Sequence, residues 1–345
     1  MKYLQQLFFI FCGIYHVSTN AFVIESPKTL QVFQRENIKY GKILIRLEHL
    51  SLLTDEIRIV ISDHVSNRTI HRSSHIITSQ SFRKLIQLPA GGWYRLDVTS
   101  LGGNQKIITQ KTITKLGLGE IFIGAGQSNS TNAGLLKTKT KTKMVVNFDG
   151  KRWRIANDPQ LGPHDNSTGG SFWPSFGDAL YRQIKVPIAV VPTGHGGTSI
   201  NRWKTNGELF RWTNNFMNIL KTESLGFRAV LWHQGENDVD MDSEEYYQKT
   251  KKMILDFKEY HDQPWFVAKV SYLSIRKNKY ASTRSAQTKL WDNQIALEGP
   301  DTDTLRGFNR DYLGFGIHFS KKGLKKHGRM WANTITQYLD SLISK

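Results

Sequence analysis

Four short apolar runs in the C-terminal two thirds of the chain place the strongest limit on its fold. They fall at residues 120–123, 188–191, 229–232 and 265–270, and polar loops and helical patterns separate them. Runs of this length are typical of strands buried on both faces, as in a parallel sheet. Strands and helices in alternation predict an α/β fold, a three-layer α/β/α sandwich in which ligands bind beyond the carboxyl ends of the strands.

The helical patterns are clearest toward the C-terminus. Asp242 followed by Glu245 forms a capping box that opens a helix over residues 243–260. A second helix is expected over residues 322–342. Both have apolar side chains at helical spacing, which predicts faces that pack on the sheet.

Residues 23–115 have a different pattern. Short runs rich in β-branched and aromatic residues, with glycine turns between them, lie at residues 30–33, 43–47, 57–61 and 93–98. This pattern predicts a small all-β, sandwich-like unit. We therefore expect three parts: a signal peptide at 1–21, a β-rich accessory domain at 22–116 and the α/β domain at 117–345.

The first 21 residues have the pattern of a secretory signal. Lys2 supplies a positive start, residues 7–15 are apolar, and small residues precede an expected cleavage after Ala21. The run is shorter than the ~20 residues that span a bilayer, so we expect no membrane span and a secreted protein, extracellular or periplasmic.

Cys12 is the only cysteine. A lipid anchor there is the alternative, which the bulky Phe11 disfavours, and a mature chain without cysteine has no disulfide or thiol nucleophile.

The chain is strongly basic. Its 47 Lys and Arg against 29 Asp and Glu give a formal net charge of +18, which attracts anions. Lysines alternate with threonines from Lys137 to Lys143, and a second cluster lies at residues 321–326. For an exported protein the expected partner is an acidic polysaccharide, a sialylated glycan or a charged surface. Nucleic acid is not expected, because no aromatic or base-reading context accompanies the lysines; a solvated face without a ligand is the alternative.

Polar residues follow three of the strands and precede the last helix. Ser128 lies in a glycine-flanked turn after the first strand, where a serine can act as a nucleophile. Residues 193–203 contain three glycines, whose N–H groups can hold an oxyanion. After the third strand, the amide of Gln234 can reach the same oxyanion, while Glu236 can order neighbouring loops or hold substrate. His318 can serve as a general base. Each of these features alone also fits a purely structural role.

Together these segments resemble a known family. The chain is similar to the SGNH-hydrolase superfamily, in its sialate O-acetylesterase-like branch of carbohydrate esterases, in the motifs Gly126-Gln127-Ser128-Asn129, Gly196-Gly197-Thr198, Gln234-Gly235-Glu236 and Ile317-His318-Phe319. The resemblance covers residues 117–345 and implies the SGNH-hydrolase fold with a flavodoxin-like sheet. The leading β-rich part, with its segment at residues 32–35, is loosely similar as well.

The resemblance implies a role for each motif. Ser128 is the nucleophile and His318 the base, while the N–H groups of Ser128 and Gly197 and the side chain of Gln234 form the oxyanion hole. Ser128 would attack an acetyl ester on a sugar, His318 would return the proton to the leaving alcohol, and water would free the acetyl group. No metal and no organic cofactor is implied.

One position departs from the family pattern. An aspartate usually stands three residues before the histidine, but this position is Phe315. Asp311 or a backbone carbonyl could orient the imidazole instead; loss of the correct tautomer can cost about 10⁴ in rate.

Arg202 and Trp203 are expected sugar contacts, with a packed tryptophan as the alternative, and residues 149–165 are expected to form a loop over the site.

The expected function is that of a secreted serine esterase that removes O-acetyl groups from a carbohydrate, either sialic acid or a polysaccharide. Its partner would be an acetylated glycan, anionic in view of the basic charge. The alternative is a non-catalytic glycan-binding protein that keeps the esterase fold, motivated by Phe315. A lysine-rich structural or nucleic-acid-binding protein is a third reading, in which binding would fall steeply with salt.

Overall fold

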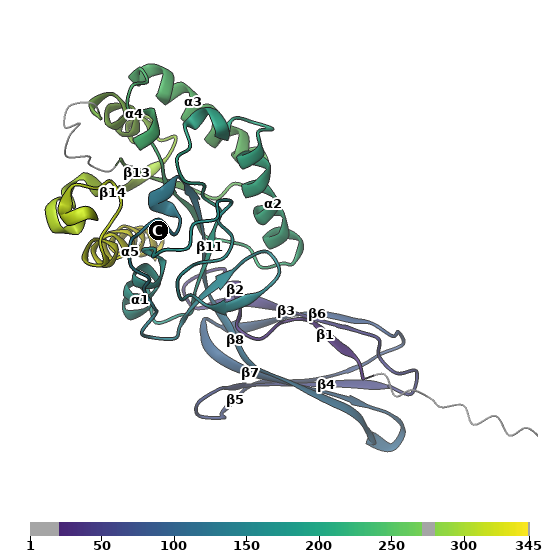
Figure 1. The fold of residues 1–345 in the computed structure, drawn as a ribbon. Coiled ribbons are helices and arrows are strands. Elements are labelled where there is room, and N and C mark those ends of the chain that lie inside the picture. Colours follow the sequence, from purple (N-terminus) through teal and green to yellow (C-terminus); the bar gives the residue numbers. More distant parts are fainter. Residues whose placement is uncertain (1–20, 271–279, 344–345) are drawn as a thin grey trace, which may run out of the picture.

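The computed structural model describes residues 21–270 and 280–343. These residues form one large sheet, a separate three-stranded sheet and five α-helices (Figure 1). The predicted mixed α/β fold is thereby confirmed. Residues 1–20 of the predicted signal segment, Cys12 among them, lie outside the described residues.

One long strand organises the chain. Strand β8, Ile107–Gly126, pairs antiparallel with β7 (Gly91–Leu101) along its first part. Along residues 120–126 it pairs parallel with β11 (Ile188–Pro192) on one side and β12 (Ala229–His233) on the other. The same strand therefore runs from the N-terminal β region into the centre of the helix-covered sheet, as Figure 1 shows.

The helix-covered part of the sheet has the order β10-β9-β11-β8-β12-β13-β14. All neighbours along this path are parallel except β10 and β9. The predicted strands at residues 188–191, 229–232 and 265–270 are confirmed. The remaining strands of this part are β9 Val145–Phe148, β10 Trp153–Ile155, β13 Trp265–Lys269 and β14 Leu297–Asp301. The prediction of a loop over residues 149–165 is wrong at Trp153–Ile155, which form the short edge strand β10.

Helices cover both faces of this sheet. Phe122 packs with α1 and α5 on one face, whereas its neighbours Ile121 and Ile123 pack with the other three helices on the opposite face, because successive side chains of a strand point to opposite sides. No helix in the described part of the chain is long and apolar enough to cross a membrane. The helices are α1 Trp173–Ile184, α2 Glu208–Thr222, α3 Ser243–Lys258, α4 Ala281–Asp292 and α5 Lys321–Ile343.

Both helices predicted from the sequence are confirmed. Helix α3 begins one residue after Asp242, whose side chain accepts hydrogen bonds from the N–H groups of Glu244 and Glu245. Helix α5 covers the second predicted helix, and Trp331 and Ile335 of its apolar stripe are fully buried.

The N-terminal region consists of two β layers that share one hydrophobic cluster. In β4 the isoleucines at 57, 59 and 61 are all fully buried and alternate with partly exposed residues. The strand predictions for this region are confirmed. One layer contains β1 Val23–Ser26, β3 Tyr40–Glu48 and β6 Phe82–Pro89; the other contains β4 Glu56–Asp63, β5 Thr69–Ile76, β7 and β8, with β2 Gln31–Gln34 also paired to β8.

A buried ion cluster fixes β2 to the centre of the sheet. Glu120, which is fully buried, accepts hydrogen bonds from the Nε atoms of Arg35 at 2.6 Å and Arg228 at 2.8 Å. The Nε2 atom of Gln34 donates to the same carboxylate at 2.7 Å. Two residues of the segment at 32–35 therefore act as partners of the central strand.

We expect Glu120→Gln to lower the free energy of unfolding by about 3 kcal/mol, because it leaves two guanidinium groups without their buried counter-charge. Equilibrium unfolding in urea measures the change. The matched control is Glu36→Gln, which breaks an exposed pair with Lys42 and should cost less than about 0.5 kcal/mol. Equal losses in the two variants would contradict a stabilising role for the cluster.

Candidate active site

A cavity of about 400 Å³ brings residues from four of the sequence motifs together. Its walls come from the loops that follow β8, β11 and β12 and from the loop before α5. Because the chain crosses from β11 on one side of β8 to β12 on the other, the cavity lies at the point where ligands bind in open α/β sheets. This Ser128 cavity is lined by Gln127, Ser128, Gly196, Gly197, Glu236, Asn237, Ile317 and His318.

The turn that carries Ser128 is fixed by a close approach of two strands. Strand β8 ends at Gly126, where φ is +124° and a Cβ atom would lie 2.1 Å from the carbonyl oxygen of His233. Only glycine fits this position. The N–H of Gln127 then donates to the same carbonyl at 2.9 Å, and a short 3₁₀ turn, Ser128–Ser130, follows. Ser128 is 9% exposed, in the wall of the cavity.

The glycine loop lies directly beside this serine. A Cβ atom on Gly196 would be 3.6 Å from the Cβ of Ser128, and the N–H of Gly196 donates to Asp165 Oδ2 at 2.6 Å. Gly197 is exposed and has a φ of +67°. Within the described residues, the N–H groups of Ser128 and Gly197 have no acceptor of their own. Both are therefore free to donate to a ligand in the cavity.

Gln127, the neighbour of Ser128 in the first motif, ties two loops together. Its side-chain oxygen accepts hydrogen bonds from the N–H groups of Gly235 and Asn237, both at 3.1 Å. It therefore joins the Ser128 turn to the loop after β12. The only sequence signal for this linking role is the position of Gln127 next to Ser128 in the motif.

Glu236 acts as a second tie between the loops. Its Oε1 atom accepts from Asn129 Nδ2 at 2.8 Å and from His233 Nε2 at 3.1 Å. Burial alone would raise the pKa of Glu236, but the charge of His233 and these hydrogen bonds outweigh burial and lower the pKa to about 2. Asn129 also donates to the carbonyl of Ile317 at 3.3 Å. These contacts favour loop ordering over substrate binding as the role of Glu236.

His318 lies in a loop that brings Asp311 beside it. The N–H of Asp311 donates to the carbonyl of His318 at 3.0 Å, and Asp311 Oδ2 is 3.6 Å from His318 Nδ1. A Cβ atom on Gly316 would lie 1.6 Å from Asp311 Oδ1, so glycine is required beside this carboxylate. Phe315 is 69% exposed and stays outside the cavity wall. Of the two alternatives for orienting the imidazole, the structure brings the side chain of Asp311 to Nδ1.

The expected role of Gln234 in the oxyanion hole is contradicted. Gln234 is fully buried and does not line the cavity. Its Nε2 atom donates to the carbonyl of Thr198 at 2.9 Å and to Asp238, and its Oε1 atom accepts from the hydroxyl of Tyr246 at 2.9 Å. Both amide hydrogens are therefore already used, and the side chain, packed beneath the glycine loop, has none left to donate to an oxyanion.

The two expected sugar contacts also lie away from the cavity. Trp203 is fully buried, where its Nε1 atom donates to Thr198 Oγ1 at 3.1 Å and its ring packs edge-on against Trp232. Direct contact of Trp203 with a sugar is therefore wrong, and the packed tryptophan is the correct alternative. Arg202 is exposed but pairs with Glu208 at 3.0 Å and does not line the cavity.

The groups that remain in the cavity are those of acyl transfer. A hydroxyl, an imidazole with a carboxylate behind it, and two free N–H groups border one space. Within residues 21–270 and 280–343, no three or more His, Cys, Asp and Glu side chains are grouped to hold a metal ion.

Comparison with known proteins identifies a family and a shared fold. The family described as "Carbohydrate esterase, sialic acid-specific acetylesterase" matches residues 118–337. A carbohydrate acetylesterase from Xanthomonas citri superposes with a TM-score of 0.59 at 14% identity, over 93% of this chain and 76% of its own. A protein from Arabidopsis thaliana superposes with a TM-score of 0.53 at 18% identity, over 64% and 98%. At these identities the superpositions show a shared fold. No curated protein is significantly similar in sequence.

Proposed function

The chain belongs to the sialic acid-specific acetylesterase family of carbohydrate esterases and is a carboxylic ester hydrolase; from this premise we propose a serine esterase that removes O-acetyl groups from a glycan through an acyl-serine intermediate. The observation that carries the proposal is that Ser128, Gly197 and His318, which are far apart in the sequence, line one cavity.

The proposed reaction has two halves. In the first, His318 takes the proton of Ser128 Oγ as this oxygen bonds to the acetyl carbon, and then gives it to the sugar oxygen as the ester bond breaks. In the second, His318 removes a proton from water as the water attacks the acetyl-serine, and returns it to Ser128 Oγ as the acyl–oxygen bond breaks and acetate leaves. The N–H groups of Ser128 and Gly197 hold the oxyanion in each half. The exposed side-chain amide of Asn237, in the same cavity wall, is available as a third donor, and Asp311 orients His318.

The finer fold assignment is also proposed. The strand order β11-β8-β12-β13-β14 corresponds to 2-1-3-4-5 along the chain, which is the order of flavodoxin-like sheets and supports an SGNH-hydrolase fold over residues 117–345. Residues 22–116 would be a β-rich accessory domain. We further propose export after removal of the signal peptide, which would bring the enzyme to extracellular or periplasmic glycans.

A fluorophosphonate should label Ser128 and no other serine of the purified mature chain, because the Ser128 hydroxyl shares a cavity with an imidazole and free N–H donors. Mass spectrometry of the digested protein locates the adduct. His318→Ala is the control, and we expect it to slow labelling at least 100-fold, within the range of general-base effects.

The alternative, a non-catalytic glycan-binding protein, predicts the opposite result. It would bind acetylated glycan without any adduct at Ser128 and without turnover of 4-nitrophenyl acetate. That combination would overturn the proposed esterase.

A further inference from the structure

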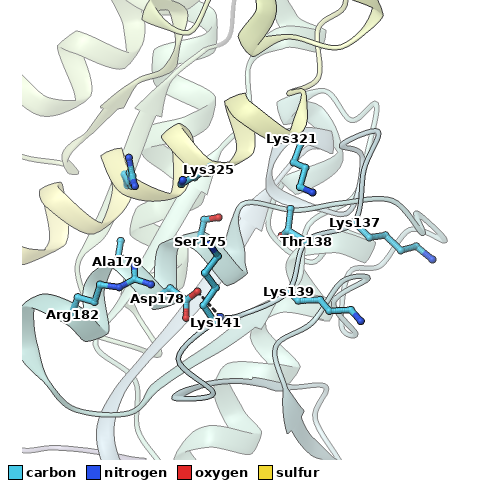
Figure 2. Close-up of a pocket in the computed structure, with 11 residues that line it drawn as sticks. Lys137, Thr138, Lys139, Lys141, Ser175, Asp178, Ala179, Arg182, Lys321 and Lys325 are labelled. Atoms are coloured by element: carbon cyan, nitrogen blue, oxygen red, sulfur yellow. Dashed lines mark hydrogen bonds between the residues drawn. The ribbon is translucent and has the colours of Figure 1, made fainter.

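A second cavity, of about 730 Å³, lies between helices α1 and α5 and shares no lining residue with the Ser128 cavity. Three lysines of the segment before β9 line it, Lys137, Lys139 and Lys141, together with Arg182 of α1 and three cations of α5. Figure 2 shows α5 on one side of this space, with α1 and the lysine segment on the other. We term it the basic groove. It unites the two lysine clusters that are far apart in the sequence.

The lysine segment is held in place by its threonines. Thr138 Oγ1 donates to Asp158 at 2.8 Å, and the hydroxyls of Thr140 and Thr142 donate to Asp178 at 2.6 and 2.7 Å. Two backbone N–H groups of the segment also donate to Asp178. The threonines are half-buried while the lysines between them are exposed. The alternation therefore presents every lysine on the outer side of a fixed segment.

Helix α5 adds a straight row of charge. Lys321, Lys325 and Arg329 follow one another at intervals of four residues, so they lie on one face of the helix and span ~12 Å of its axis. The one acidic side chain in the wall, Asp178, is committed to the threonine segment. Among the described residues, none of the seven cations forms an ion pair. Like charges gathered without counter-ions attract a multivalent anion.

The lining favours an acidic sugar polymer over other anions. No aromatic side chain lines the groove, so it lacks the stacking surfaces that bind nucleic-acid bases. Ala179 is the only apolar residue in its lining, so the groove has no large apolar side chain of the kind that inserts into a membrane. Its volume lies within the ~300–1,000 Å³ of ligand sites.

The groove also begins beside the proposed reaction centre. Lys321 follows His318 by three residues, a stretch of chain that reaches ~11 Å at most. We infer that the basic groove binds an acidic polysaccharide and holds it so that its acetyl esters reach the Ser128 cavity. Only the identification of this polymer as the substrate rests on the proposed function; its binding does not.

The test is calorimetric titration of the mature protein with polygalacturonate, compared with neutral dextran. We expect binding of polygalacturonate only, and a triple variant, Lys139→Gln, Lys325→Gln and Arg329→Gln, should raise its Kd about tenfold, since each exposed charge pair contributes modestly. The control variant is Lys39→Gln, Lys84→Gln and Lys106→Gln, which removes the same charge from exposed lysines of the N-terminal β region. It should leave Kd within about twofold, and both should keep the turnover of 4-nitrophenyl acetate.

Three results would overturn the inference: no binding of polygalacturonate, equal weakening in both variants, or groove-dependent binding that is tighter for single-stranded DNA or anionic lipid vesicles. The two proposals fail separately. Groove-dependent binding without any labelling of Ser128 would support the binding role of the groove and contradict the esterase proposal. Labelling of Ser128 without groove-dependent binding would contradict the groove proposal alone.

Discussion

Replacement of Ser128 by alanine is expected to lower kcat for 4-nitrophenyl acetate and for acetylated glycans by about 10⁶-fold, the scale seen when a serine hydrolase loses its nucleophile. The expectation follows from position: Ser128 is the serine that lines the cavity with His318 and Gly197. Without its hydroxyl no acyl-enzyme can form, although the free N–H groups still bind and polarise the ester. Steady-state hydrolysis followed by release of 4-nitrophenol measures the loss.

Ser130→Ala is the matched control from the same turn. Ser130 Oγ donates to the carbonyl of Gln127 at 2.7 Å and does not line the cavity. Its removal should cost about 1 kcal/mol of stability and change kcat by less than about tenfold. Comparable activity of Ser128→Ala and the wild-type chain would show that Ser128 is not the nucleophile.

The sequence could predict that these loops meet, because parallel strands end at one edge of a sheet. Ser128, the glycine loop and Glu236 each follow a buried strand, and pairing of these strands in register brings their loops together. The helices could be predicted for a different reason. Capping and apolar spacing are local properties of the sequence, and the helix that follows Asp242 has both.

Side-chain directions within those loops could not be predicted. Gln234 stands in the expected motif, but its amide is taken by the Thr198 carbonyl and Asp238, which depends on how two loops pack. Trp203 follows the glycine loop in sequence, yet it packs against Trp232 of the central sheet. The edge strand β10 and its neighbour β9 were missed because three and four residues carry too little pattern.

The position of Asp311 depends on the shape of a single loop. The segment from Arg310 to Phe319 folds back on itself through a backbone bridge between its ends. This fold brings residue 311 next to residue 318 and leaves Phe315 exposed at the far end. The position three residues before His318 is therefore occupied by the exposed Phe315, while the carboxylate nearest the imidazole comes from Asp311, seven residues before it.

Asp311→Asn is accordingly expected to reduce kcat by about 10³ to 10⁴, because the amide cannot favour the imidazole tautomer that accepts a proton at Nε2. In the free enzyme, Asp311 Oδ2 lies 3.6 Å from His318 Nδ1. That is longer than a good hydrogen bond, but catalytic contacts commonly tighten only when substrate is bound. The variant should bind substrate normally, so that the loss appears in kcat more than in KM. Initial rates over a range of substrate concentrations separate the two parameters.

Two changes at Phe315 make the test specific to this carboxylate. Because Phe315 is exposed and outside the cavity wall, Phe315→Ala should keep kcat within about threefold. Adding Phe315→Asp to Asp311→Asn restores an aspartate at the usual spacing, but this carboxylate would start from the exposed end of the loop and should not recover activity. An Asp311→Asn variant with kcat within tenfold of the wild type would assign the orientation of His318 to a backbone carbonyl instead. Recovery in the double variant would show that the loop rearranges to accept a carboxylate at either position.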